Sequence, residues 1–312
     1  RDITVAAAGS ANFGAMTASA LGTTTISLST SAEVDFGAII TDAAVGAIEI
    51  GGEDGADVTY GAIGATSVGA IAVSGALDVT FGTITAVSVG EVNNTQQGAS
   101  GSFTIDLSGV TNAMEMNLGA ATNSIIGGAG NDVITLLGGR TAAAGNDTIN
   151  YNATGQGTDN ILNFIAGAAA SGGDVIALST AISTATLFDV DGSAIANATT
   201  VDLSVAMTAT GDTLVATDNI IVIATALSTT AGMLDFIDGV TMTTAAIASA
   251  TFVVAWGDGS DTYVTLVDAI GAGSAAAVTL ASGGHTLSAS TLGVLQGVTP
   301  GALVAANFDF IT

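Results

Sequence analysis

The chain has 312 residues, and its 27 acidic side chains and two basic ones, Arg1 and Arg140, give a formal net charge of −25. Binding to nucleic acid or to an anionic membrane needs clustered Lys and Arg, so this composition excludes both functions. It contains no cysteine, which excludes disulfides and thiolate metal sites, and no run of about twenty apolar residues, which excludes a transmembrane helix. The remaining composition, with 42 glycines, one proline and 49% hydrophobic residues, predicts an all-β fold of short strands and tight turns whose small partners are cations.

Residues 1–120 contain an internal repeat of about 22 residues. An aromatic–glycine pair recurs at Phe13-Gly14, Phe36-Gly37, Tyr60-Gly61 and Phe81-Gly82, and a valine–glycine pair follows the last three at Val45-Gly46, Val68-Gly69 and Val89-Gly90. Each unit holds two short β-like segments. One unit cannot bury its apolar face alone, whereas stacked units form a continuous core, so the repeat predicts a parallel β-solenoid. A β-sandwich of short strands, with the similarity arising by chance, is the alternative.

Glycine–asparagine–aspartate turns replace this pattern over residues 121–180, and the clearest of them is residues 127–135. The run Gly127-Gly128-Ala129-Gly130-Asn131-Asp132-Val133-Ile134-Thr135 matches the calcium-binding nonapeptide of β-rolls at every position. The glycines permit backbone conformations that direct several carbonyl oxygens to one point, and Asp132 adds an anionic oxygen. Oxygen ligands suit Ca²⁺, whereas zinc and copper prefer nitrogen and sulfur, for which the chain offers one histidine and no cysteine.

Degenerate copies of the nonapeptide follow, and one of them is split by an insertion that contains Arg140. Asp159 comes 27 residues after Asp132, and Asp174 comes 27 residues after Asp147. We expect two cation sites, one between each of these pairs. In an ideal coil of two nine-residue turns, stacked aspartates would be about 18 residues apart, so about nine residues per pair must bulge out of the coil. The predicted calcium-binding residues are Gly128, Gly130, Asp132, Gly145, Asp147, Gly157, Asp159 and Asp174.

Three further groups of acids are weaker candidates. Residues 51–59 resemble the nonapeptide with one extra residue, and either a calcium ion or solvated turn acids would explain them. Residues 189–192 lack the later glutamate of an EF-hand loop, which favours a plain turn. Residues 258–261 are expected to form the turn of a hairpin over Thr251–Val267, with a bound cation as the alternative. Trp256 is expected in the core, with a platform for a sugar as the alternative.

The turn-rich segment resembles a known family. Residues 158–164, followed by residues 173–179, are similar to the end of a repeat block in the repeats-in-toxin (RTX) family of secreted calcium-binding proteins. With its lysine-free body rich in Thr, Ala, Gly and Val, the chain resembles the C-terminal part of RTX-type bacterial surface-layer (S-layer) proteins, closely over 121–180 and loosely over 181–312. The sequence departs from many relatives in having one full nonapeptide, so two or three ions are expected.

The resemblance implies Ca²⁺-triggered folding outside the cell and export by type I secretion machinery. That machinery reads an uncleaved C-terminal signal, which the tail at residues 305–312 resembles; a last β-strand there would be compatible with this role. The first residues, Arg1-Asp2-Ile3, show neither an initiator Met nor the apolar core of a signal peptide, so we expect a processed product or a fragment of a longer protein.

We expect a parallel β-solenoid or β-roll of stacked coils followed by a C-terminal β-rich cap. The first segment, residues 1–120, holds the 22-residue repeats. The second, residues 121–180, is the RTX-like calcium-binding β-roll, and the third, residues 181–312, is a β-rich domain with the secretion signal.

No sequence motif marks an enzyme. His285, the only histidine, lies in a segment that reads as a polar turn, and the zinc-protease helix, nucleophile elbow and Walker loop are all absent. A glycosidase built on two carboxylates stays open, although few aromatic residues are present on which a sugar could stack.

The expected function is that of a calcium-dependent, self-assembling structural subunit of a bacterial extracellular surface layer or filament. Its partners would be its own copies, the secretion machinery, and a cell-surface glycan or lipopolysaccharide. A net charge of −25 should make like subunits repel, and divalent bridging or high salt would remove that penalty. Two alternatives stay open: an adhesin or other binding module, and the export-and-folding region of a larger secreted enzyme.

Overall fold

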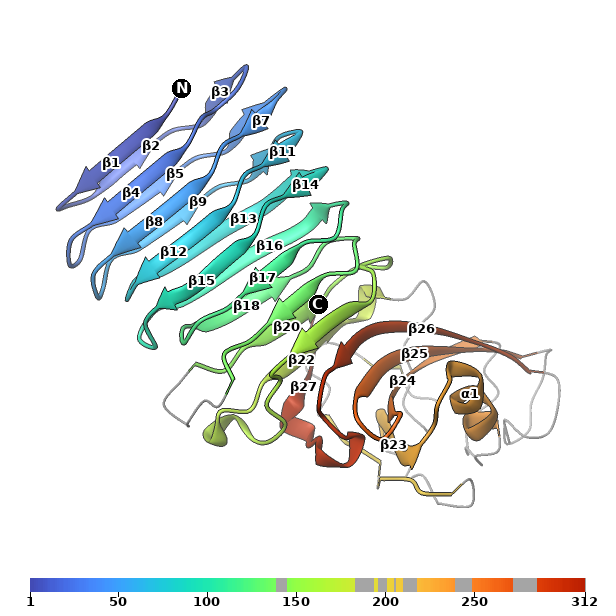
Figure 1. The fold of residues 1–312 in the computed structure, drawn as a ribbon. Helices are drawn as coiled ribbons and strands as arrows, with labels where there is room; N and C mark the ends of the chain where they lie inside the picture. The colour runs from blue at the N-terminus through green and yellow to red at the C-terminus, as the bar shows by residue number, and fades with distance from the viewer. Residues whose placement is uncertain are drawn as a thin grey trace. The chain divides into compact units, whose positions relative to one another are not determined.

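The computed structural model describes residues 1–138, 145–182, 194–195, 201–204, 206–209, 218–238, 249–271 and 285–311. A parallel β-solenoid of about seven turns covers residues 3–178, and an antiparallel β-rich region follows it (Figure 1). The predicted solenoid is confirmed, and the alternative of a β-sandwich is wrong. The chain divides into two compact units. The first holds residues 1–150, 159–163 and 169–174, and the second holds residues 151–158, 164–168 and 175–312.

Two long parallel sheets run through the first unit, and successive coils contribute strands to both. Within this unit sheet A consists, in spatial order, of β1 (Ile3–Ala7), β4 (Thr24–Leu28), β8 (Ile48–Gly52), β12 (Ile71–Gly75), β15 (Val92–Gln97), β17 (Glu115–Asn117), β19 (Val133–Thr135) and β21 (Asp159–Leu162). Sheet B consists of β2 (Ala11–Phe13), β5 (Glu33–Phe36), β9 (Asp57–Tyr60), β13 (Asp78–Ala86), β16 (Ser102–Val110), β18 (Thr122–Ile126) and β20 (Thr148–Tyr151).

Short strands complete the early coils. The strands β3 (Met16–Ala18), β6 (Ile39–Thr41) and β10 (Ile63–Gly64) form a row that ends on β13. A small third sheet contains β7 (Ala44–Val45), β11 (Ser67–Val68) and β14 (Ser88–Val89). After β14 no such short strand is present among the described residues of the solenoid, and each later coil has one strand in sheet A and one in sheet B.

The strand register places like residues over like. The aromatic residues of the repeat form one inward column, in which the rings of Phe13, Phe36, Tyr60 and Phe81 stack with centroids 4.8, 4.6 and 4.8 Å apart. Val34, Val58 and Val79 form the next inward column along the same strands. A repeat of about 22 residues therefore becomes a continuous ladder of apolar contacts, as the solenoid prediction requires.

Both glycine repeats mark places where the backbones of successive coils touch. A Cβ atom on Gly37 or Gly61 would lie 2.6 or 2.9 Å from a backbone nitrogen of the preceding coil. A Cβ atom on Gly69 or Gly90 would lie 2.7 Å from such a nitrogen. Since real Cβ atoms do not come this close to backbone, only glycine allows the coils to stack at these corners.

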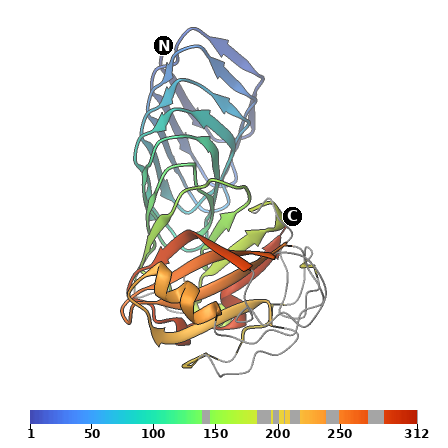
Figure 2. The same cartoon turned by 90° about the vertical axis from the view of Figure 1, so that its right-hand side faces the viewer.

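The second unit is built on an antiparallel sheet. The strands β24 (Ser249–Gly257), β25 (Thr262–Gly271) and β26 (His285–Leu295) are antiparallel neighbours, and β23 (Ile220–Ala226) pairs in parallel with β24. The helix α1 (Thr230–Asp238) lies against this sheet (Figure 2). Its Met233, Phe236 and Ile237 pack in one core cluster with Phe252, Val254 and Trp256. The predicted hairpin and the predicted core position of Trp256 are both confirmed.

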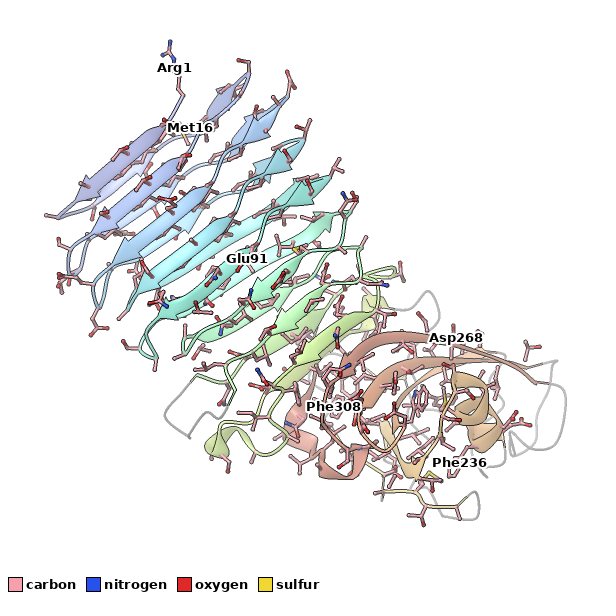
Figure 3. All side chains as sticks on the ribbon, viewed as in Figure 1. Arg1, Met16, Glu91, Phe236, Asp268 and Phe308 are labelled. Carbon is pink, nitrogen blue, oxygen red and sulfur yellow. The ribbon has the colours of Figure 1, made fainter. Side chains whose placement is uncertain are left out.

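The C-terminal tail of this unit forms a strand. The strand β27 (Phe308–Ile311), whose Phe308 is labelled in Figure 3, pairs in parallel with β22 (Val175–Ser179). Phe308 and Phe310 are buried. Short 3₁₀ helices lie at Ala169–Ser171 (η1), Thr180–Ile182 (η2), Pro300–Ala302 (η4) and Ala305–Asn307 (η5). Over the part of the chain that the structure describes, no helix is long and apolar enough to cross a membrane.

Candidate metal centre

The four aspartates that the sequence pairs come together, two by two, on consecutive coils of the first unit. Asp132 directly precedes β19 and lies beside Asp159, the first residue of β21, because Val133 pairs with Asn160. The backbone N–H of Asp132 donates to Asp159 Oδ1 at 3.0 Å. The two residues stand one full coil apart, and residues 139–144 between them lie outside the described residues.

The second pair has the same arrangement on the other sheet. The backbone N–H of Asp147 donates to Asp174 Oδ1 at 3.0 Å, and these residues directly precede β20 and β22. Asp147 Oδ1 in turn accepts hydrogen bonds from the backbone N–H of Asn123 at 3.2 Å and from its Nδ2 at 2.7 Å. Because one pair adjoins sheet A and the other adjoins sheet B, the structure places them as two separate groups.

The four carboxylates are buried, with no more than 1% of each residue exposed. Asp132 Oδ1 accepts a hydrogen bond from Met114 N–H at 3.0 Å, and its Oδ2 accepts one from Gly128 N–H at 3.1 Å. Burial raises the pKa of Asp132 above its ordinary value, and these two hydrogen bonds oppose the shift without cancelling it. A buried carboxylate therefore favours either a proton or a bound cation as its compensation.

The predicted glycines of the site allow the coils to stack closely. Cβ atoms on Gly130 and Gly145 would collide with the backbone of the preceding coil at Ala113 and Thr122, and one on Gly128 would lie 2.6 Å from the carbonyl oxygen of Val110. Gly157 has a φ of 79°, in the left-handed region that other residues rarely adopt. Their role as carbonyl ligands of calcium stays a prediction.

The second oxygens of the first pair both lie beside Gly127. A Cβ atom there would lie 3.0 Å from Asp132 Oδ2 and 3.4 Å from Asp159 Oδ2, so only glycine leaves both oxygens their room. Two carboxylates would supply some of the six to eight oxygen ligands that calcium takes. Among the described residues no three His, Cys, Asp or Glu side chains gather in one metal-binding group, so an ion here would complete its shell with backbone carbonyls and water.

A row of buried amides leads to the second pair and was not predicted from the sequence. Asn94, Gln97 and Asn123 are at most 2% exposed. Asn94 Nδ2 donates to Asn123 Oδ1 at 2.6 Å and to Gln97 Oε1 at 2.9 Å, and Gly119 N–H donates to Asn94 Oδ1 at 2.7 Å. Asn123 stands in register with Phe103, at an inward position that earlier coils fill with apolar side chains. In the sequence, this row of amides is marked only by polar residues at positions that turn out to be inward, and those positions are recognised only once the strand register is known.

The weaker acidic groups have different outcomes. In residues 51–59, Glu53 Oε2 accepts hydrogen bonds from Thr30 Oγ1 at 2.6 Å and Thr30 N–H at 3.2 Å, which hold the pKa of that carboxyl below its usual range. Asp258 Oδ1 accepts from the N–H groups of Ser260 and Asp261, as the predicted hairpin turn requires.

Two predicted turns remain, residues 189–192 and the segment around His285. Residues 189–192 lie outside the described residues. His285, expected within a polar turn, is instead the first residue of β26, where its backbone pairs with Gly271.

Comparisons of the chain with protein-family models, with curated proteins and with solved structures find no match. The resemblance to RTX-type surface-layer proteins therefore depends on the turn motifs and the composition. The solenoid fold is compatible with that resemblance.

Proposed function

We propose that this chain is a structural subunit of a bacterial extracellular surface layer or filament, exported by type I secretion and held in its folded, self-associating form by calcium. The observation that carries the proposal is the buried pair Asp132 and Asp159, whose second oxygens both lie beside Gly127. In a chain with 27 acidic and two basic residues, a cation is the natural compensation for such a pair.

In this proposal Asp132 and Asp159 hold one ion, and Asp147 and Asp174 hold a second. Each ion joins two consecutive coils, because the members of a pair stand one coil apart. An ion that binds only the folded chain adds a stability of about 2.7 kcal/mol when its concentration exceeds Kd a hundredfold. Low cytosolic calcium would thus leave the chain easy to unfold for export, and extracellular calcium would complete the fold.

The net charge bears on contact between copies of the chain. Repulsion from the net charge of −25 opposes contact between copies, and divalent cations would relieve it.

Negative-stain electron microscopy and circular dichroism of the purified chain, in millimolar calcium and then in chelator, test this proposal. We expect ordered sheets or fibres that dissolve in chelator, and the double variant Asp132→Asn/Asp159→Asn should lose the calcium response. Asp258→Asn, which neutralises an acid in an exposed hairpin turn, is the matched control and should assemble as the unmodified chain does. A chain that folds and assembles equally well in chelator would overturn the calcium role. A calcium-folded monomer that never assembles would favour an adhesin or the export region of a larger enzyme.

A further inference from the structure

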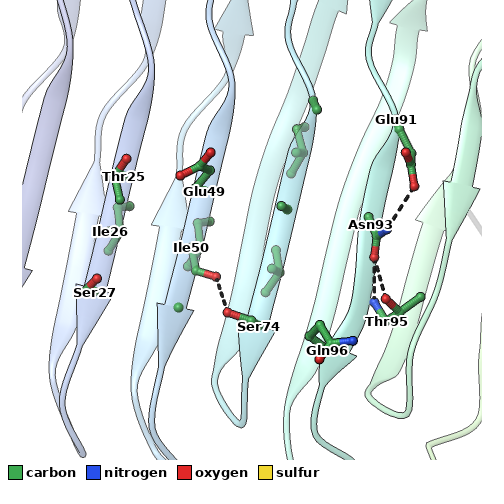
Figure 4. Close-up of a pocket in the computed structure, with 15 residues that line it drawn as sticks. Thr25, Ile26, Ser27, Glu49, Ile50, Ser74, Glu91, Asn93, Thr95 and Gln96 are labelled. Carbon is green, nitrogen blue, oxygen red and sulfur yellow. Dashed lines mark hydrogen bonds between the residues drawn. The ribbon is translucent and has the colours of Figure 1, made fainter.

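A shallow groove of about 660 Å³ lies on the outer face of sheet A, across β4, β8, β12 and β15 (Figure 4). Its floor consists of the small residues Gly51, Ala72 and Ser74. Ser74 Oγ donates to the carbonyl oxygen of Ile50 at 3.3 Å, which fixes the floor to the strand beside it. Four strands at a spacing of about 4.8 Å give the groove a length of about 14 Å along the stack.

One rim of the groove is built by a β-bulge in β15. Ala72 pairs with Asn93 and Ser74 pairs with Gln96, so β15 contains one residue more than β12 between these pairs. The extra residue lets Thr95 and Gln96 both stay exposed at the rim before Gln97 turns into the core. Asn94 is inward by the ordinary alternation of the strand, two residues after the buried Val92. Bulges of this kind often redirect side chains next to binding sites.

Hydrogen bonds hold the rim in place before any ligand binds. Asn93 Oδ1 accepts from Thr95 Oγ1 at 2.7 Å and from Thr95 N–H at 3.1 Å, and Asn93 Nδ2 donates to Glu91 Oε1 at 2.9 Å (Figure 4). Glu91 Oε1 also accepts from Asn117 Nδ2 at 3.0 Å. The rim therefore presents amide and hydroxyl groups in fixed positions, which lowers the entropic cost of binding.

The chemistry of the groove is that of hydroxyl, amide and carboxylate groups. Thr25, Ser27 and Glu49 line the side opposite the bulge, whereas the isoleucines and valines of the same strands are buried beneath the sheet. Hydroxyls and amides both donate and accept hydrogen bonds, as sugar hydroxyls do. Glu49 and Glu91, with no Lys or Arg in the lining, repel an anionic ligand.

We propose that this groove binds an extended glycan chain of uncharged sugars. Peptides bind to sheet edges or through apolar anchors, and this surface is the middle of a sheet with no exposed large apolar side chain in its lining. No aromatic side chain lines the groove, so affinity per site is modest, and repeated copies in an assembly would strengthen it through avidity. The inference does not depend on calcium binding or assembly, and its test is separate from theirs.

Isothermal titration calorimetry of the chain of residues 1–312 with three hexasaccharides tests the proposal. Chitohexaose and cellohexaose are uncharged, and hexagalacturonate is acidic and of similar length. We expect at least one uncharged hexasaccharide to bind and hexagalacturonate to bind at least tenfold more weakly. Absence of binding by both uncharged ligands, or equal binding of the acidic one, would overturn the proposal.

Matched variants locate the binding surface. Ala72→Tyr fills the floor of the groove and should weaken binding at least tenfold. Thr80→Tyr adds the same ring to an exposed position on β13, the next strand of the same coil on sheet B, and should leave affinity within twofold. Asn93→Ala removes the rim amide without adding bulk, so it tests the site even if Ala72→Tyr does not fold; the exposed Asn12→Ala is its control. Unchanged affinity in Asn93→Ala and in a folded Ala72→Tyr would place any binding elsewhere.

Discussion

Tyr60 lies in the middle of the aromatic stack with its hydroxyl buried and without a hydrogen-bond partner among the described residues. Burial raises the pKa of this phenol well above its usual value, so the group stays neutral wherever the fold survives. Tyr60→Phe keeps the ring and removes the unsatisfied hydroxyl. We expect the free energy of unfolding in urea to rise by about 1 kcal/mol.

The contrasting variant Tyr60→Ala separates the ring from the hydroxyl. It removes the contacts with Phe36 and Phe81 and should cost about 3–5 kcal/mol, as other buried aromatic truncations do. A loss of stability in Tyr60→Phe comparable to that in Tyr60→Ala would show that the hydroxyl is satisfied in solution.

Asp132 gives a prediction about pH in the absence of calcium. Its pKa in the folded chain is raised by burial, so the folded state binds more protons than the unfolded state between the ordinary Asp value of about 3.9 and the higher folded value. Stability from this group is thus fully present below the lower value and lost as pH rises through the folded pKa. Asp132→Asn cannot titrate, so in chelator its stability relative to the unmodified chain should improve as pH rises across this window.

Urea unfolding of both chains over a pH series in chelator measures this difference. In saturating calcium at neutral pH we expect the unmodified chain to be more stable than Asp132→Asn, because only the unmodified chain keeps both carboxylates of the pair. A stability difference that stays constant from acid to neutral pH would contradict the burial of an ionisable Asp132.

At the level of one coil, two glycines differ in whether the fold requires them. A Cβ atom on Gly69 would lie 2.7 Å from the backbone nitrogen of Ala47, whereas one on Gly64 would have no atom within 4 Å. Gly69→Ala must push two coils apart and should cost about 1–3 kcal/mol. Gly64→Ala, in β10 of the same coil, should be neutral or stabilising by about 0.5 kcal/mol, because alanine restricts the unfolded chain. Thermal and urea unfolding of both variants check the contrast, and an equal cost in the two would disprove it.

The early coils were predictable because each repeat places the same residue types at the same corner. Phe36-Gly37 and Val68-Gly69 marked stacked rings and touching backbones, and the structure contains both. The neighbour relation of Asp132 and Asp159 also followed from the turn motifs and their spacing. The buried amides could not be predicted, since Asn94 and Asn123 are polar residues at inward positions, and a polar side chain gives no sign of burial until the strand register is known. The groove on sheet A was missed for the same reason, because small residues form a floor only when the register brings them together.

At the scale of the whole molecule, calcium should act unevenly. All four paired aspartates belong to the first compact unit, and the cluster around Trp256 belongs to the second. The backbone amides of Met114, Gly128 and Asp132 donate directly to carboxylates of the first pair. If an ion binds there only when the coils are folded, these amides open less often in calcium, whereas amides of β24 and β25 are affected only as far as the two units unfold together.

Hydrogen–deuterium exchange in millimolar calcium and in chelator measures this directly. At a hundredfold excess over Kd we expect protection of the amides of Met114, Gly128 and Asp132 to rise about a hundredfold, the kinetic counterpart of about 2.7 kcal/mol. The amides of β24 and β25 should change much less, and Asp132→Asn/Asp159→Asn should remove most of the gain at Met114 and Gly128. A uniform gain in both units that survives this double substitution would mean that calcium acts through the net charge of −25 as a general screening ion. Magnesium at equal concentration separates the two cases, because general screening depends on valence, whereas a flexible oxygen cradle selects the larger ion.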